Sequence, residues 1–199
     1  GDQPEWFHWG NHGHKPPIDI AANFYPSRGP YSSSDFSILQ QHMADIRGAG
    51  VDTVVVSWWG PGSYEDRELA GVVRAAQAEG IRVAIHLEPY DGRTPELVQR
   101  DVLALSTRWG IREFWIYLAD GPAPEAWQPL TSMFADLTFW AHGHSPSNGV
   151  RGLFQAYAAR AGFDGVYTYD PVRYTPSQFA TFCRLARTRG LRCSPSVSP

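Results

Sequence analysis

The chain has 199 residues, a net charge of -3 and a pI near 6.2, and 43% of its residues are hydrophobic. This length suits one domain with a sizeable core, and the charge provides no basic surface for nucleic acid or for an anionic membrane. No apolar run approaches the roughly 18 residues of a membrane span, and the N-terminus lacks the apolar segment of a signal peptide.

Residues 1–34 are rich in proline and serine and are predicted to be irregular. Helical spacing of apolar residues and helix-capping signals then predict six helix-strand units. The helices are expected at 35–49, 66–79, 95–108, 124–133, 149–161 and 175–189, and the strands at 51–57, 81–87, 113–118, 136–141, 163–168 and 191–197.

Glycine stands between a predicted helix and the next strand at five places. A glycine just past a helix reverses the chain, and helical crossovers are what parallel strands require. Apolar runs such as Val54-Val55-Val56 are typical of a parallel sheet that is covered on both faces. The five junctions are Gly50-Val51, Gly80-Ile81, Gly110-Ile111, Gly162-Phe163 and Gly190-Leu191.

Two α/β architectures fit this pattern: a doubly wound sheet and a (β/α)8 TIM-type barrel. We favour a barrel that is incomplete in this chain, because about six units are present where a barrel has eight. The chain also begins in a long loop and stops at the end of a strand. Residues 1–199 are expected to form a single domain.

The predicted strands end on polar and aromatic residues, which parallel pairing would gather at one rim. In α/β folds this rim is where ligands bind. His86 and Glu88 lie two residues apart and therefore share a face, and Pro89 ends the strand. Glu88 is interpreted as an acid, base or ligand-orienting group in preference to a residue that merely bonds a loop. Aromatic residues at these ends indicate stacking on a sugar ring, with ordinary core packing as the equal alternative.

Several carboxylates follow strands and are candidates for the pair that a glycosidase needs. Asp170 closes the segment Tyr167-Thr168-Tyr169-Asp170, and Asp120 follows another strand. Asp91 precedes Gly92 and is better interpreted as a turn residue. The sequence does not fix the separation of any of these carboxyl groups.

A metal centre is a disfavoured alternative. His142-Gly143-His144 has the spacing of a metal-binding pair, but Pro146 and Ser147 behind it predict a loop. No phosphate loop, dinucleotide fingerprint or serine-hydrolase elbow is present, so no cofactor is expected. The other residues that could serve as metal ligands are His8, His12, His14, His86 and Glu88.

Cys183 and Cys193 are the only cysteines of the chain. Cys183 lies on a predicted helix and Cys193 on the strand that follows it. Both are expected as buried thiols, with a disulfide between them as the less favoured alternative. The redox compartment stays open at this point.

Several separated motifs occur in the order and spacing of one known family. Together they resemble glycoside hydrolase family 99, the endo-α-1,2-mannosidases. The motifs are Asn23-Phe24-Tyr25-Pro26, Gly29-Pro30-Tyr31-Ser32-Ser33, Ser57-Trp58-Trp59, His86-Leu87-Glu88-Pro89-Tyr90-Asp91-Gly92-Arg93, Pro124-Glu125-Ala126-Trp127, Gly162-Phe163-Asp164-Gly165-Val166-Tyr167-Thr168-Tyr169 and Pro195-Ser196-Val197.

The resemblance implies an eight-stranded barrel that cleaves an α-1,2-mannosidic bond within a mannose-rich glycan, with retention of configuration. Trp59 stands where bacterial members of the family have tryptophan, which implies mannan-like substrates as well as N-glycans. The resemblance also favours an extracytoplasmic location, whether secreted, periplasmic or in the lumen of the secretory pathway. The expected substrate contacts are Trp58, Trp59, His86, Glu88, Tyr90, Tyr117, Tyr167 and Tyr169.

The sequence departs from the family pattern at both ends. The family's first strand is absent, and its catalytic carboxylates lie in an Asn-Glu-Trp-His-Glu-type motif that we expect beyond Pro199. Glu88 and Asp170 are the rim carboxylates that could replace them. Missing segments or a partner chain are therefore expected to complete the barrel.

Three functions remain open on the sequence. The first is a glycoside hydrolase of the endo-α-1,2-mannosidase type. The second is a catalytically incomplete carbohydrate-binding or structural protein on the same scaffold, and the third is a metal-dependent barrel hydrolase.

Overall fold

The computed structural model describes residues 8–118, 124–142, 153–169 and 175–196. They belong to two compact units, one formed by residues 1–52 and 68–81 and the other by residues 53–67 and 82–199. Asp120 and Asp170, two of the carboxylates considered above, lie outside the described residues. The expectation of a single domain stays a prediction.

The first unit joins the irregular N-terminal segment to two helices. Helix α1 (Phe36–Gly48) is capped by Asp35, whose side chain accepts a hydrogen bond from the Ser37 amide. Most of helix α2 (Tyr64–Ala78) belongs to the same unit. A Cβ added to Gly71 of α2 would lie only 3.1 Å from Leu39 of α1, so this glycine allows close packing of the two helices.

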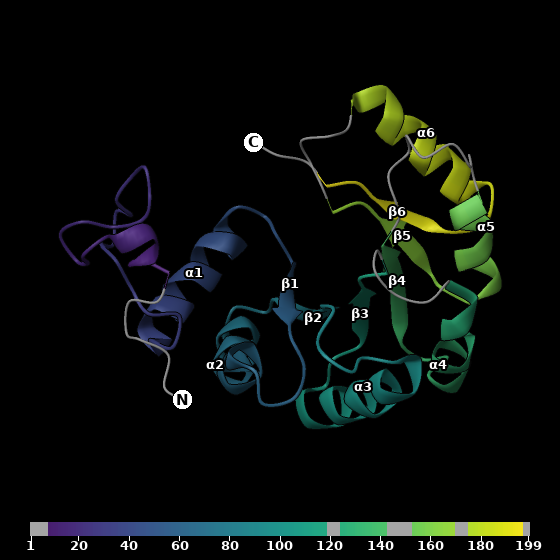
Figure 1. Cartoon of the computed structure of the whole chain (residues 1–199), viewed down its shortest axis with the longest axis horizontal. Helices are drawn as coiled ribbons and strands as arrows, with labels where there is room; N and C mark the ends of the chain where they lie inside the picture. Colours follow the sequence, from purple (N-terminus) through teal and green to yellow (C-terminus); the bar gives the residue numbers. More distant parts are fainter. Residues whose placement is uncertain (1–7, 119–123, 143–152, 170–174, 197–199) are drawn as a thin grey trace. The chain divides into compact units, whose positions relative to one another are not determined.

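The second unit is built on a six-stranded parallel sheet with helices along it (Figure 1). A 3-10 helix, η2 (Pro124–Trp127), leads directly into helix α4 (Gln128–Met133). The strands are β1 (Thr53–Trp58), β2 (Arg82–Leu87), β3 (Glu113–Ile116), β4 (Thr138–His142), β5 (Gly165–Tyr167) and β6 (Arg192–Ser194), and the helices are α3 (Pro95–Trp109), α4 (Gln128–Met133), α5 (Leu153–Arg160) and α6 (Pro176–Arg187).

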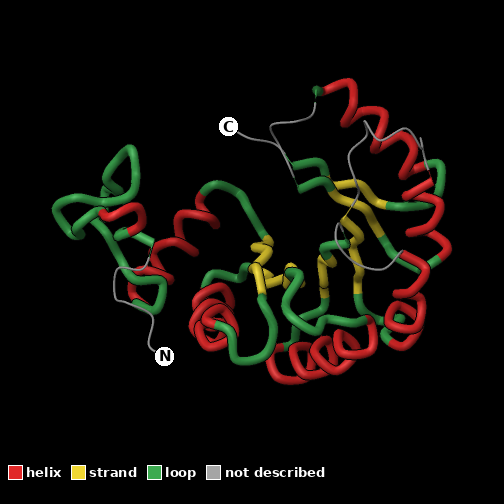
Figure 2. Tube along the Cα trace, in the orientation of Figure 1, coloured by secondary structure: helices red, strands yellow, loops and turns green. Residues whose placement is uncertain are grey.

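The strand order decides between the two architectures that the sequence allowed. The strands lie side by side in chain order, β1-β2-β3-β4-β5-β6, and every neighbouring pair is parallel. A doubly wound sheet would reverse its strand order at a switch point, whereas a β/α barrel does not. The second unit is thus part of a TIM-type barrel, as predicted, and the succession of strands and helices can be followed in Figure 2.

The two faces of the sheet have different residues because side chains alternate along each strand. Phe114 and Ile116 of β3 point to the helical side and are fully buried. The opposite face, called the inner face below, is defined by residues that stand in register on neighbouring strands. These are Ser57, His86, Trp115, Trp140 and Gly165.

Local signals placed the elements within a few residues of their predicted bounds. Thr94 and Thr175 cap α3 and α6 with their side chains, and a proline follows each at the start of the helix. All five junction glycines have a positive φ, between 66° and 80°. Among the described residues, no helix combines the length and the apolar character needed to cross a bilayer. Residues 149–152 of the predicted fifth helix lie outside the described part of the chain.

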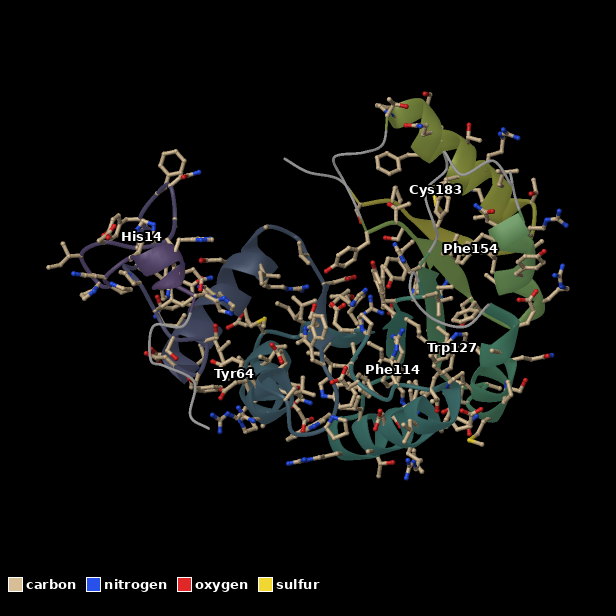
Figure 3. All side chains as sticks on the ribbon, in the orientation of Figure 1. His14, Tyr64, Phe114, Trp127, Phe154 and Cys183 are labelled. Carbon is tan, nitrogen blue, oxygen red and sulfur yellow. A yellow bond between two sulfur atoms is a disulfide. The ribbon has the colours of Figure 1, made fainter. Side chains whose placement is uncertain are left out.

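The expectation of two free thiols is wrong. Cys183 of α6, labelled in Figure 3, and Cys193 of β6 form a disulfide with Cα atoms 5.3 Å apart. Cys193 alternates with Arg192 and Ser194 and so points from the strand to the helical side, where α6 packs. The helix therefore presents Cys183 to its own following strand, at a Cα separation that suits a disulfide.

Candidate functional site

The end of β2 carries two polar side chains that are almost completely buried. His86 is the penultimate residue of the strand and Glu88 the first residue after it, and they are 5% and 4% exposed. Because they are two residues apart, both belong to the inner face. The ladder continues briefly past the strand, since the Glu88 amide donates to the Trp58 carbonyl at 3.0 Å. The backbone therefore fixes both side chains.

A chain of hydrogen bonds links three strands through these residues. The Tyr167 hydroxyl lies 2.6 Å from His86 Nε2, and His86 Nδ1 lies 2.8 Å from Glu88 Oε1. Ser57 Oγ donates to the same oxygen of Glu88 at 2.8 Å. An ionised carboxylate can only accept, so His86 donates from Nδ1. In the neutral ring Nε2 accepts a hydrogen bond from the Tyr167 hydroxyl, whereas in the protonated ring Nε2 donates to the Tyr167 oxygen.

These hydrogen bonds determine whether Glu88 is ionised. Burial alone raises the pKa of a carboxyl group, but the hydrogen bond and charge of His86, with Ser57 and the Arg93 guanidinium, outweigh it and lower the pKa of Glu88 below its usual value of 4.5. Burial, reinforced by the Glu88 charge, raises the pKa of Tyr167 well above its usual value. At neutral pH the site therefore holds a carboxylate and a protonated phenol.

Aromatic rings surround this chain. Tyr169 stacks on His86 with ring centroids 5.3 Å apart, and Tyr117 stacks on His142 at 4.5 Å. Tyr169 is 52% exposed, so one side of this cluster is open to solvent. We call His86, Glu88, Tyr117, His142, Tyr167 and Tyr169 the rim cluster.

A layer of indoles supports the rim cluster on the inner face. Trp115 and Trp140 stack at 4.8 Å, and Glu113 accepts a hydrogen bond from both indole N–H groups at 2.9 and 2.8 Å. Trp140 lies over Gly165, where an added Cβ would come within 2.4 Å of the ring. Trp115 in turn contacts Tyr167, with ring centroids 4.8 Å apart. Tyr167 therefore packs against Trp115 and also hydrogen-bonds His86.

A separate pocket of about 650 Å³ lies beside the ends of β1 and β2. Trp59, 46% exposed, forms part of its wall, and Tyr90 donates a hydrogen bond to Asp101 within it. The Tyr90 ring packs on Gly60, whose φ of 94° and whose missing Cβ permit the approach. Burial raises the pKa of Asp101. We call this the flanking pocket, and its lining residues are Trp59, Gly60, Pro61, Pro89, Tyr90, Asp91, Leu97 and Asp101.

The structure gathers most of the predicted contact residues but separates them into these two groups. Trp59 and Tyr90 line the flanking pocket, whereas the predicted residues of β2, β3 and β5 form the rim cluster. Trp58 belongs to neither group. It is the last residue of β1, only 2% exposed, and its indole N–H donates to Asp66 of α2 at 2.9 Å. Asp91 lies in the turn that the Asp-Gly pair predicted.

Sequence reasoning missed two members of the site. His142 was predicted in a loop, but it is the last residue of β4, 8% exposed. Trp115 lies inside the predicted strand 113–118 and is not among the predicted contact residues. Both follow the alternation of their strands, and extending β4 by one residue would have aligned His142 with the other strand ends.

A metal site finds no support among the residues that the structure describes. No group of three or more His, Cys, Asp or Glu side chains there could hold a metal ion. His8, His12 and His14 belong to the other compact unit, and His144 lies outside the described residues.

Known proteins resemble this chain in sequence. It is 31% identical over 215 residues to the glycoprotein endo-alpha-1,2-mannosidase of Xenopus laevis, an alignment that covers 94% of this chain and 48% of the frog protein. It is 30% identical to the human glycoprotein endo-alpha-1,2-mannosidase-like protein, covering 78% of this chain and 39% of the human one. The chain thus spans about half the length, or less, of these relatives.

A solved structure resembles it in fold. The GH99 endo-alpha-mannosidase of Bacteroides thetaiotaomicron superposes with a TM-score of 0.78 at 25% identity, covering 92% of this chain and 59% of that protein. The profile of glycosyl hydrolase family 99 matches residues 4–134. With the barrel strands and the rim cluster in place, these matches show that the chain belongs to glycosyl hydrolase family 99.

Proposed function

We propose that this chain supplies a sugar-binding wall of an endo-α-1,2-mannosidase and that its ligand is an α-1,2-linked mannoside. The observation that carries the proposal is the chain Tyr167-His86-Glu88-Ser57, which holds one ionised carboxylate at the rim of a family 99 barrel. The name of the frog relative, glycoprotein endo-alpha-1,2-mannosidase, supports the linkage.

The arrangement suits a sugar. The ionised Glu88 accepts hydrogen bonds from ligand hydroxyls, and charge-assisted bonds of this kind are roughly twice as strong as neutral ones. Both protein donors bond Oε1, so the ligand would meet Oε2. Tyr169 and Trp59 are each about half exposed, so their rings can offer apolar surface to the C–H side of a pyranose.

Glu88 serves in this proposal as a ligand-orienting group and not as the catalytic acid. An acid must carry a proton near the working pH, whereas the lowered pKa of Glu88 keeps it ionised. Glycoside hydrolysis needs two carboxyl groups placed about the scissile bond. We propose that the catalytic pair lies outside residues 1–199, as the family motif implies.

Binding of methyl α-1,2-mannobioside to the natural full-length protein, measured by titration calorimetry, tests this function. Glu88→Gln should weaken binding by roughly tenfold to a hundredfold, the effect of losing hydrogen bonds to a charge. Glu125→Gln is the matched control, because Glu125 is exposed and pairs with Arg160 on the surface. Equal affinities for Glu88→Gln and Glu125→Gln would refute the proposed site.

A catalytically incomplete binding protein is the second candidate, favoured by the single ionised carboxylate of the rim cluster. Release of disaccharide from an α-1,2-mannan separates the two. Turnover by the full-length protein but not by residues 1–199 supports the enzyme, and binding without turnover by either supports the second candidate. Turnover by residues 1–199 that Glu88→Gln abolishes would place the catalytic pair within this chain.

We also propose an extracytoplasmic location and a barrel completed by further polypeptide. The Cys183–Cys193 disulfide supports the location, because such bonds persist in oxidising compartments. Among the described residues, β1 and β6 each pair with one strand only, which supports completion by another segment or chain.

A further inference from the structure

Arg93 bridges the ends of two strands that carry the rim cluster. Its Nη1 donates to the Leu87 carbonyl at 2.9 Å, and its Nη2 donates to the Tyr117 carbonyl at 2.6 Å. The two carbonyls belong to neighbouring chain segments, at the last residue of β2 and just beyond β3. The planar guanidinium can hold two acceptors at a fixed spacing, which a point charge cannot do.

The bridge lies where the sheet's own hydrogen bonds become poor. The last β2–β3 pair in register is Leu87 with Ile116, and the next bond, from the Tyr117 amide to the Leu87 carbonyl, is long at 3.3 Å. Glu88 and Tyr117 are the first residues past this point, and both carry side chains of the rim cluster. Arg93 therefore takes over from the ladder at the position where the site begins.

The local chain is built to bring Arg93 back to the strand ends. After Tyr90 the backbone turns through Gly92, whose φ of 73° suits glycine, and the Arg93 amide donates to the Tyr90 carbonyl at 3.1 Å. The guanidinium then lies over the ring of Trp127, labelled in Figure 3, at 5.6 Å from the centroid. Trp127 is fully buried, so the cation rests on a fixed surface.

We propose that Arg93 is a positioning residue, which sets the spacing of the β2 and β3 ends and thereby the placement of the Glu88 carboxylate and the Tyr117 ring for a ligand. In this role it acts on the ligand through these two residues. Its positive charge also acts on Glu88. The other titratable groups that interact with Glu88 are His86 on the same strand, Tyr167 at the end of β5 and Tyr169 just beyond β5. The effect on the ligand rests on the function proposed above.

Two substitutions in the full-length protein separate the two parts of this role. Arg93→Met removes the charge and both donors, whereas Arg93→Lys keeps the charge but loses the planar pair of donors. Arg160→Met is the matched control, since Arg160 also lies over a ring, that of Tyr157 at 4.6 Å, and pairs with Glu125 on the surface. Thermal unfolding first establishes that each variant is folded at the temperature used.

The first measurement is the pH titration of the Glu88 carboxyl carbon by NMR, which needs no ligand. We expect the pKa of Glu88 to rise in Arg93→Met, to stay near that of the natural protein in Arg93→Lys, and to be unchanged in Arg160→Met. The second is calorimetric binding of methyl α-1,2-mannobioside. Misplaced groups lower affinity, so we expect at least about a tenfold loss in Arg93→Met and a smaller loss in Arg93→Lys.

The outcomes distinguish this proposal from the proposed function. A folded Arg93→Met protein in which the pKa of Glu88 and the affinity for the mannoside match those of the natural protein would overturn the positioning role. The role would also fail if Arg93→Met and Arg160→Met lost the same stability and neither changed the pKa of Glu88 or the affinity. If the natural protein does not bind the mannoside, the proposed function fails, and the Glu88 titration then decides the role of Arg93 by itself. If Arg93→Met does not fold, the affinity of Arg93→Lys decides instead, and natural affinity would overturn the role.

Discussion

Glu88 in the rim cluster is almost completely buried and Asp101 in the flanking pocket is half-buried, and both carboxyl groups lie in networks with a tyrosine. Their pKa values nevertheless move in opposite directions. Glu88 receives hydrogen bonds from His86 and Ser57 and the charge of Arg93, which together outweigh burial. Asp101 has a hydrogen bond from Tyr90, but burial and the negative charge of Asp66 prevail. The number and charge of the donors, rather than burial, decide in which direction the pKa of each carboxyl group moves.

The largest expected effect comes from removing the principal donor of the ionised group. His86→Leu should lower the free energy of unfolding by about 3 kcal/mol at pH 7, because it leaves a buried carboxylate without its principal donor. Urea unfolding measures the change, and the loss should shrink in acid, where Glu88 takes up a proton. A change below about 1 kcal/mol would mean that solvent, not His86, stabilises the Glu88 charge.

The pH dependence of stability should show directly that the pKa values of Glu88 and Asp101 are shifted in opposite directions. The pKa of Glu88 is below its unfolded value of 4.5, so its stabilisation is complete above that value and is lost as the pH falls through the folded pKa. The pKa of Asp101 is raised above 3.8, so its ionisation opposes folding and stability is regained on acidification. Urea unfolding between pH 7 and 3 should show a shallower acid loss in Glu88→Gln and a steeper one in Asp101→Asn. If stability fell with pH in the same way in both variants, the two pKa values would not be shifted in opposite directions.

Ligand contact is expected to differ between the two regions as well. Trp59→Ala should weaken binding of methyl α-1,2-mannobioside by about 1 kcal/mol, or fivefold, through loss of one stacking face. Calorimetry gives the value, with Trp109→Ala as a control for an indole on the helix side of the unit. An unchanged affinity would assign the ligand to the rim cluster alone.

The smallest effect is expected at the hydrogen bond between Tyr90 and Asp101. Tyr90→Phe should lower the free energy of unfolding by about 0.5–1 kcal/mol, the net contribution of an ordinary hydrogen bond, because Asp101 can take up a proton or meet water in the open pocket. Chemical denaturation at pH 7 provides the measurement. A loss as large as that of His86→Leu would show that the Tyr90 bond carries an ionised Asp101.

The fold was predictable because its signals are local. Capping residues such as Thr94 and Thr175 mark helix starts, and glycines at the helix-strand junctions mark their ends. These features set the order of elements, and parallel pairing then brings the strand ends together. The site could be predicted only in part, since Trp58 and Trp59 are consecutive and alternation sends them to opposite faces of the sheet. One residue of uncertainty in a strand end decides which of the two lines the flanking pocket.

Long-range contacts explain what the sequence did not predict. The bridge from Arg93 to the Tyr117 carbonyl spans 24 residues and depends on the turn at Gly92, and the disulfide depends on how α6 packs on its own strand. No spacing in the sequence encodes either distance. A charged residue behind a turn allows several partners, and two cysteines ten residues apart can either pair or stay reduced.

The disulfide has a consequence for alignment at the end of the sheet. Strand β6 is only three residues long, and a slip by one residue would turn its side chains to the opposite face. Cys193 can reach Cys183 only while it points to the helical side, and this orientation keeps Ser194 beside Tyr167 and Arg192 over the Trp140 ring. The covalent bond therefore acts as a register pin, which keeps a short terminal strand in phase with the residues of the rim cluster.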